Sequence, residues 1–204
     1  MKKIKSVKSI EIKRAFLIAD HIRRSKEKKD YLGKIDKQQF VHKLKVAKAK
    51  ILALPEGKLD LLISETFPKR LTAFDSSDWY IGTFKSSEVG VWRRAGELPL
   101  EWTNDSLEET AKAVSKAIIS KSKKFKNRAK STIPNILEIN VDIIQKEKYL
   151  FPIVFEGNTG TKGRRRLKKK MQGNIDDGCM RSIALVIKGV KEIKGYLGFP
   201  KIIT

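Results

Sequence analysis

Two carboxylates and an amide stand at the ends of neighbouring apolar segments of this chain. Asp142 lies near the end of the run 136–144, Glu156 closes the run 149–156, and Asn158 follows it. A short polar connection joins the two runs, a pattern that predicts a pair of adjacent strands. Because side chains alternate along a strand, Asn158 is expected on the same face as Glu156.

Carboxylates on adjacent strand ends are the oxygen ligands that Mg²⁺ prefers. The ion activates water and stabilises charge on the reacting phosphate during phosphodiester hydrolysis. We therefore expect Mg²⁺ as cofactor, with Asp142 and Glu156 as catalytic metal ligands and Asn158 positioning water or phosphate. In the alternative interpretation, both carboxylates simply end strands at the surface.

A dense basic segment follows this pair of runs. Its cations cover too wide an arc to form one stripe of a helix, and like charges one turn apart destabilise a helix. Phosphate binding explains such a density, and arginine also recognises guanine edges in a major groove. The DNA-binding residues expected here are Arg164, Arg165, Arg166, Lys168, Lys169 and Lys170.

The charge of the whole chain also favours a polyanionic partner. Its 204 residues include 45 Lys and Arg against 23 Asp and Glu, a formal net charge of +22. So large an excess is most easily stabilised by neutralising phosphates, as in nucleic acids. The alternative is a lysine-rich surface that serves only solubility.

Cysteine and histidine counts exclude several kinds of site. One Cys and two His leave no internal disulfide, no Cys-rich zinc site and no His-dependent catalytic triad as an expectation. The lone Cys179 fits a reducing cytoplasm. Neither a membrane-spanning apolar run nor an apolar signal core is recognised in the sequence.

Cations and aromatic residues are interleaved in the middle of the chain. The β-prone runs 78–84 and 88–92 predict a hairpin. Its cations are Lys85, Arg93 and Arg94, and its aromatics include Trp79, Tyr80 and Trp92. Such a mixture clamps a sugar-phosphate backbone or stacks on bases. The alternative is a core hairpin with a solvated rim.

Helical patterns dominate the start of the chain and recur later. Helices are predicted over about 10–29, from a capping box at Asp36 to Pro55, and after a second capping box at Ser106. The stretch 59–67 fits a helix or a strand, and 183–187 predicts a strand.

We expect an α/β fold with a mixed central sheet flanked by helices. One domain, 1–204, would comprise a helical lobe over 1–70 and a sheet-containing catalytic core over 75–204.

The segment around Asp142 and Glu156 resembles the active-site signature of the PD-(D/E)XK nucleases, the superfamily of most type II restriction endonucleases. That resemblance implies a metal-binding hairpin, a crossing helix and a further strand. The chain departs from the family pattern at Val141, where proline is usual, and at Asn158, where lysine is usual, so Lys162 is a candidate substitute. In another register, 151–157 resembles a core strand beyond the active site, which gives Glu156 a structural or recognition role.

The predicted function is a sequence-specific, Mg²⁺-dependent endonuclease for double-stranded DNA, acting as a homodimer in the cytoplasm. A non-catalytic basic DNA- or RNA-binding protein is the main alternative. A recombinase or RNA-processing nuclease with other catalytic residues is the third.

Overall fold

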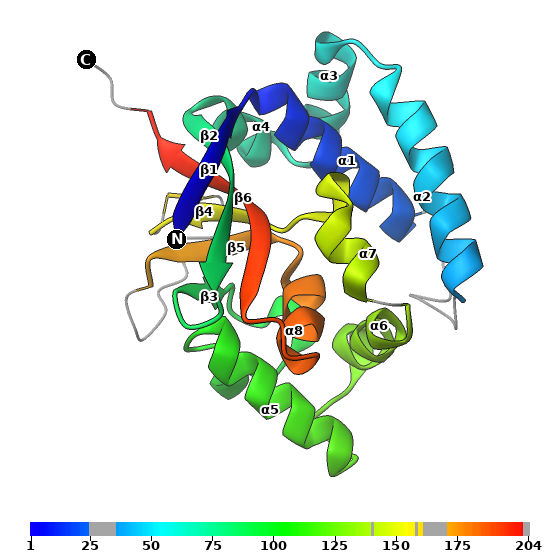
Figure 1. Cartoon of the computed structure of the whole chain (residues 1–204), viewed down its shortest axis with the longest axis vertical. Helices are drawn as coiled ribbons and strands as arrows, with labels where there is room; N and C mark the ends of the chain where they lie inside the picture. The colour runs from blue at the N-terminus through cyan, green and yellow to red at the C-terminus, as the bar shows by residue number, and fades with distance from the viewer. Residues whose placement is uncertain (25–35, 140, 158, 161–170, 202–204) are drawn as a thin grey trace.

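An open, six-stranded mixed sheet forms the centre of the protein (Figure 1). The structure is a computed structural model that describes residues 1–24, 36–139, 141–157, 159–160 and 171–201. The strands are β1 (Lys2–Val7), β2 (Ser77–Lys85), β3 (Val89–Val91), β4 (Ile153–Glu156), β5 (Gly173–Asp177) and β6 (Glu192–Pro200). With helices flanking this sheet, the predicted α/β fold class is confirmed.

The strand order is β1-β2-β6-β4-β5-β3. The long strands β2 and β6 pair antiparallel from Ser77 opposite Pro200 to Lys85 opposite Glu192. β4 lies parallel to β6 and antiparallel to β5, while β5 is parallel to β3. The inner strand β4 is apolar and buried over its first three residues, as expected for a strand covered on both faces.

Helices lie on both sides of this sheet. They are α1 (Ser9–Arg24), α2 (Lys37–Leu52), α3 (Glu56–Thr66), α4 (Pro68–Asp75), α5 (Leu107–Ile119), α6 (Asn127–Glu138), α7 (Val141–Lys146) and α8 (Cys179–Ile187), with 3₁₀ turns η1 (Ala95–Glu97), η2 (Leu100–Trp102) and η3 (Lys148–Leu150). In Figure 1, α1 to α4 lie above and to the right, and α5, α6 and α8 lie below. No helix in the described part of the chain has the length and apolar character needed to cross a membrane.

Local sequence signals set the start of two helices. The Asp36 carboxylate accepts a hydrogen bond from the Gln39 backbone N–H at 2.8 Å, and α2 follows. The Ser106 hydroxyl accepts one from the Glu109 N–H at 3.3 Å, and α5 follows. Both predicted N-caps are confirmed. The ambiguous stretch 59–67 lies largely in α3, and β1 precedes the helices α1 to α4.

A chain of aromatic rings connects these helices to the sheet. Phe16 of α1 meets Phe74 of α4 at 5.8 Å between ring centroids, and Phe74 meets Trp79 of β2 at 5.8 Å. Trp79 in turn contacts Phe155 of β4 at 5.1 Å. All four side chains are almost fully buried, so this chain of rings fixes α1 and α4 on one face of the sheet.

The strand predicted over 136–144 is wrong, because this stretch contains the end of α6 and the start of α7. Ala129 and Ile133, one helical turn apart, are fully buried in α6, and α6 packs against α8. The strand predicted over 183–187 is wrong for the same reason, since it lies in the buried helix α8. Short apolar runs do not distinguish a buried helix from a strand by periodicity alone.

The hairpin predicted from 78–84 and 88–92 is also wrong. β2 pairs with β1 and β6, whereas β3 pairs with β5. A turn does follow β2, because the Glu88 carboxylate accepts a hydrogen bond from the Lys85 N–H at 2.8 Å. After this turn, β3 does not pair with β2. Trp79 of β2 is buried in the core.

Candidate functional site

The structure does not place Asp142 and Glu156 on neighbouring strands. Asp142 is exposed in the first turn of α7, and Glu156 is exposed at the end of β4, opposite Gly173. The segment β4 begins on the side of α7 and extends away from it (Figure 1). Because the first apolar run is helical, the hairpin expected to hold Mg²⁺ between these carboxylates is absent from the described residues.

The other predicted site residues have mixed outcomes. Asn158, Lys162, Arg164, Arg165, Arg166, Lys168, Lys169 and Lys170 lie outside the described residues. Lys85 is exposed at the end of β2, and Arg93 and Arg94 follow β3. Arg94 adopts a left-handed backbone conformation, with φ of 59°, and its N–H donates to the Thr103 hydroxyl at 2.9 Å.

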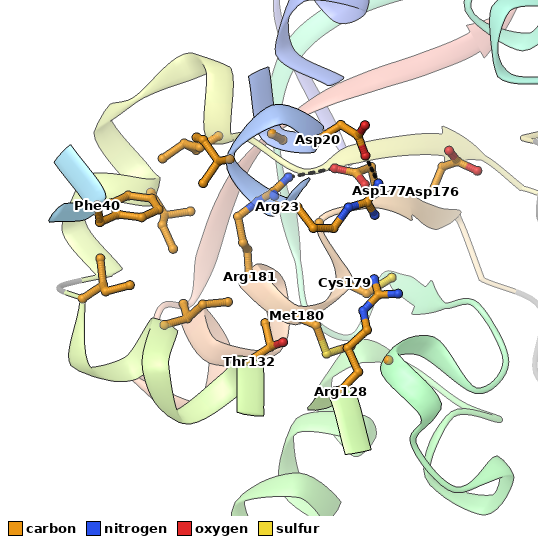
Figure 2. Close-up of a pocket in the computed structure, with 18 of the residues that line it drawn as sticks. Asp20, Arg23, Phe40, Arg128, Thr132, Asp176, Asp177, Cys179, Met180 and Arg181 are labelled. Atoms are coloured by element: carbon orange, nitrogen blue, oxygen red, sulfur yellow. Dashed lines mark hydrogen bonds and ion pairs between the residues drawn. The ribbon is translucent and has the colours of Figure 1, made fainter. Parts of the chain in front are cut away.

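A cavity of about 150 Å³ lies where several segments distant in the sequence meet (Figure 2). They include the last turns of α1, the start of α2, one face of α6 and the junction between β5 and α8. The polar lining residues include Asp20, Arg23, Arg128, Thr132, Asp177 and Arg181. Apolar lining residues include Phe40, Trp92, Ile136 and Met180. The cavity therefore combines charged groups with apolar walls, as ligand-binding sites commonly do.

A tight strand-to-helix junction positions Asp177 and Arg181. Gly178 separates β5 from α8 and has φ of 89°, a conformation that glycine adopts without strain. A Cβ atom there would lie 3.0 Å from the Pro152 Cα, so the close approach also favours glycine. One helical turn later, Arg181 Nη2 donates to Asp177 Oδ2 at 2.9 Å.

A second acid–base pair comes from α1. Asp20 accepts a hydrogen bond from Arg23 one turn further along the helix. The Asp20 side chain is 9% exposed, and that of Arg23 is 33% exposed. Figure 2 shows Asp20 and Asp177 at the upper right of the cavity, Arg128 below them and Phe40 on the left. Three aspartates, Asp20, Asp176 and Asp177, and three arginines therefore line the same small space.

Asp176, next to Asp177, has its own arginine. Arg70 Nε lies 2.7 Å from Asp176 Oδ2, and both side chains are almost fully buried. The Arg70 guanidinium also donates to the Asp176 carbonyl at 3.0 Å and lies over the Phe16 ring at 4.5 Å. Asp176 reaches the cavity lining, but its carboxylate ties α4 to β5. Of the two successive aspartates, Asp177 is therefore the candidate for ligand binding.

This arrangement is suited to a ligand that carries phosphate and hydroxyl groups. Arginine forms paired, charge-assisted hydrogen bonds with phosphate oxygens. Carboxylates accept hydrogen bonds from hydroxyl groups and bind hard cations. Among the described residues, no group of three or more His, Cys, Asp or Glu side chains is placed to hold a metal ion. A cation in this cavity would therefore rely on two carboxylates and on water, an arrangement that Mg²⁺ accepts.

In the sequence, Asp176 and Asp177 fit a cap and turn, with metal binding as the alternative, and no pattern assigns Asp20 to a site. The available signal was local: an aspartate ends a strand, glycine follows, and an arginine comes four residues after the aspartate. No signal in the sequence connects this junction to α1 or α6, because their proximity arises only from the tertiary fold.

No protein-family model, curated protein or solved structure matches this chain. The resemblance to the PD-(D/E)XK nucleases therefore stays a prediction from the sequence. The fold and the cavity are described by their own geometry.

Proposed function

We propose that this protein is a Mg²⁺-dependent endonuclease that binds and cuts double-stranded DNA at specific sequences. One observation carries the proposal: a chain with a net charge of +22 has a cavity lined by three aspartates and three arginines. The charge favours DNA as the partner. The carboxylates and arginines together supply the types of group that phosphodiester hydrolysis requires.

In this proposal the arginines contact the DNA backbone. Arg128 comes from α6, separate from both aspartates, and would bind a phosphate oxygen directly. Arg23 and Arg181 hold the carboxylates of Asp20 and Asp177 in position. The positive charge of these guanidinium groups would stabilise the charge that develops on the phosphate as the bond breaks.

Asp20 and Asp177 replace Asp142 and Glu156 as the proposed metal ligands. A carboxylate offers about four lone-pair sites on its two oxygens, so it can accept hydrogen bonds and bind a cation at the same time. Both side chains line one cavity, and their hard oxygen donors fit Mg²⁺. When bound, Mg²⁺ would supply an activated water and neutralise phosphate charge.

The proposal also covers the oligomeric state and the cellular location of the protein. Cutting both strands with one site per protomer favours a homodimer, and a role in a restriction system follows from sequence-specific cutting. The only cysteine in the sequence, Cys179, is buried and has no second cysteine with which to form an internal disulfide, which accords with a reducing cytoplasm.

Incubation of the purified protein with supercoiled plasmid, in Mg²⁺ or in EDTA, tests this proposal. We expect discrete fragments in Mg²⁺ only. Asp177→Asn and Asp20→Asn should abolish cutting but keep DNA binding, whereas the controls Asp142→Asn and Glu156→Gln should cut normally. Loss of cutting in these controls alone would return the catalytic role to the residues expected from the sequence.

A non-catalytic DNA-binding protein is the second candidate. The observation that favours it is the helical position of Asp142, which removes the predicted metal-binding hairpin. A mobility shift of the plasmid without any strand breakage in Mg²⁺ or Mn²⁺ would support this candidate and contradict the endonuclease.

A further inference from the structure

The first strand presents a run of lysines at one edge of the sheet. Lys2, Lys3 and Lys5 are exposed on β1, which pairs only with β2 in the described sheet. A shift in register between Lys3 and Lys5 places Lys3 opposite Gly82 and Lys5 opposite Ile81. Lysines therefore project on both sides of this edge, since neighbouring register positions face opposite sides of a sheet.

These lysines have no acidic partners within the described chain. Carboxylates pair elsewhere with Lys13, Lys48, Lys112, Lys124 and Lys148. The charge of the β1 edge is therefore uncompensated, which favours an external anion over an internal ion pair.

One of these cations is held in place by aromatic rings. Lys3 Nζ lies 3.7 Å from the centroid of the Phe199 ring and 4.4 Å from that of Tyr80. The two rings meet edge to face, with centroids 5.8 Å apart, on the adjacent strands β6 and β2. A lysine held in this way loses less side-chain entropy when it binds a phosphate than a freely rotating lysine does.

We infer that the β1 edge, consisting of Lys2, Lys3 and Lys5 with the supporting rings of Tyr80 and Phe199, is a second DNA-contacting surface that binds the phosphate backbone. In Figure 1, β1 lies at the left of the molecule, whereas α2 and α6, which line the cavity, lie at the right. The edge therefore contacts phosphates away from the site of cleavage. This inference rests on the DNA binding in the proposed function but not on cleavage.

The alternative role for lysines on a sheet edge is to prevent the edge strand from pairing with another chain. The two roles differ in their dependence on salt. Each lysine–phosphate contact contributes about 0.9 to the slope of log affinity against log salt concentration, whereas edge protection contributes nothing.

The experiment measures binding of the full chain to a random duplex in EDTA over a range of salt concentrations. The triple variant Lys2→Gln, Lys3→Gln, Lys5→Gln should lower the salt slope by about 2–3. The matched control changes Lys58, Lys69 and Lys116 to Gln, exposed lysines of α3, α4 and α5, and so removes the same charge. The control should lower the slope by less than one.

A ring variant tests the arrangement of Lys3. Tyr80→Leu with Phe199→Leu removes the rings that hold Lys3 but keeps every charge. DNA binding should therefore weaken several-fold, which is less than the loss caused by removing the lysines. Equal slopes for the β1 triple variant and its control would overturn the inference and leave edge protection as the role of these lysines. If the unmodified protein does not bind DNA, both the inference and the proposed function are wrong. If it binds DNA without cutting it, only the proposed endonuclease activity is wrong.

Discussion

Two clusters of charged residues in this protein differ in what they join. Lys13 of α1 is almost fully buried and lies 3.2, 2.7 and 2.9 Å from carboxylate oxygens of Glu56, Asp60 and Asp75. These acids belong to α3 and α4, so one ammonium group connects three helices. In the cavity, by contrast, Asp20 pairs with Arg23 three residues later in α1, and Asp177 at the end of β5 pairs with Arg181 four residues later in α8.

This difference separates stability from binding. When a charged residue bridges distant segments, its loss leaves buried charge without compensation and destabilises the fold. An ion pair between residues three or four positions apart connects only neighbouring parts of the chain, so its loss should cost less. Asp177 should therefore tolerate substitution better than the bridging residues do. Four predictions test this comparison.

Arg70→Met should have the largest effect on stability. Its partner Asp176 is 2% exposed in its side chain and would become a buried charge without its guanidinium. Breaking such a buried pair typically costs about 3–5 kcal/mol. Urea unfolding followed by circular dichroism measures the loss, and a change below about 1 kcal/mol would show that this bridge does not stabilise the fold.

Lys13→Met should cost less, about 2–3 kcal/mol. Lys13 is buried, but its three partners have side chains 52%, 33% and 48% exposed and can regain water. Burial opposes the charge on Lys13, yet bonds to Asp60, Asp75 and Glu56 outweigh it and raise its pKa.

The pH dependence of the Lys13 effect provides its control. A base with a raised pKa stabilises the fold fully below the unfolded value, about 10.4 for lysine, and this stabilisation is lost as pH rises towards the folded value. The difference between Lys13→Met and the unmodified protein should therefore be constant from neutral pH to about 10 and shrink above that. A difference that grows at alkaline pH would contradict the assigned sign.

The two clusters also differ in how far the sequence predicts them. The N-caps at Asp36 and Ser106 were predictable because each depends on a bond to a residue three positions away. Asp142 was misplaced because a short apolar run fits a buried helix and a strand equally well. Neither the bridge at Lys13 nor the cavity is visible in the sequence, since both depend on segments brought together only by folding.

Asp177→Asn should change stability by less than about 1 kcal/mol, because its ion pair with Arg181 joins residues only four positions apart and both side chains are partly exposed. The same substitution should abolish DNA cleavage in Mg²⁺ while leaving the urea midpoint almost unchanged. Asp176→Asn, one residue earlier, is the matched control and should lose stability instead. If Asp177→Asn unfolded as readily as Asp176→Asn, the two clusters would not differ as described.

Tyr196→Phe should have the smallest effect and should have the opposite sign. The Tyr196 ring is fully buried on β6, and its hydroxyl has no hydrogen-bond partner among the described residues. Removing a buried polar group that lacks a partner is neutral or stabilises by about 1 kcal/mol.

Burial, followed by the charges of Glu11, Tyr149 and Glu147, raises the pKa of Tyr196. The unfolded chain therefore ionises its tyrosine first, and the unmodified protein loses stability above about pH 10, where the phenylalanine variant has no such group. The advantage of Tyr196→Phe in urea unfolding should consequently grow with pH in that range. If Tyr196→Phe were less stable than the unmodified protein, the hydroxyl would make a contact that stabilises the fold. Tyr196 would then resemble the paired residues Lys13 and Arg70.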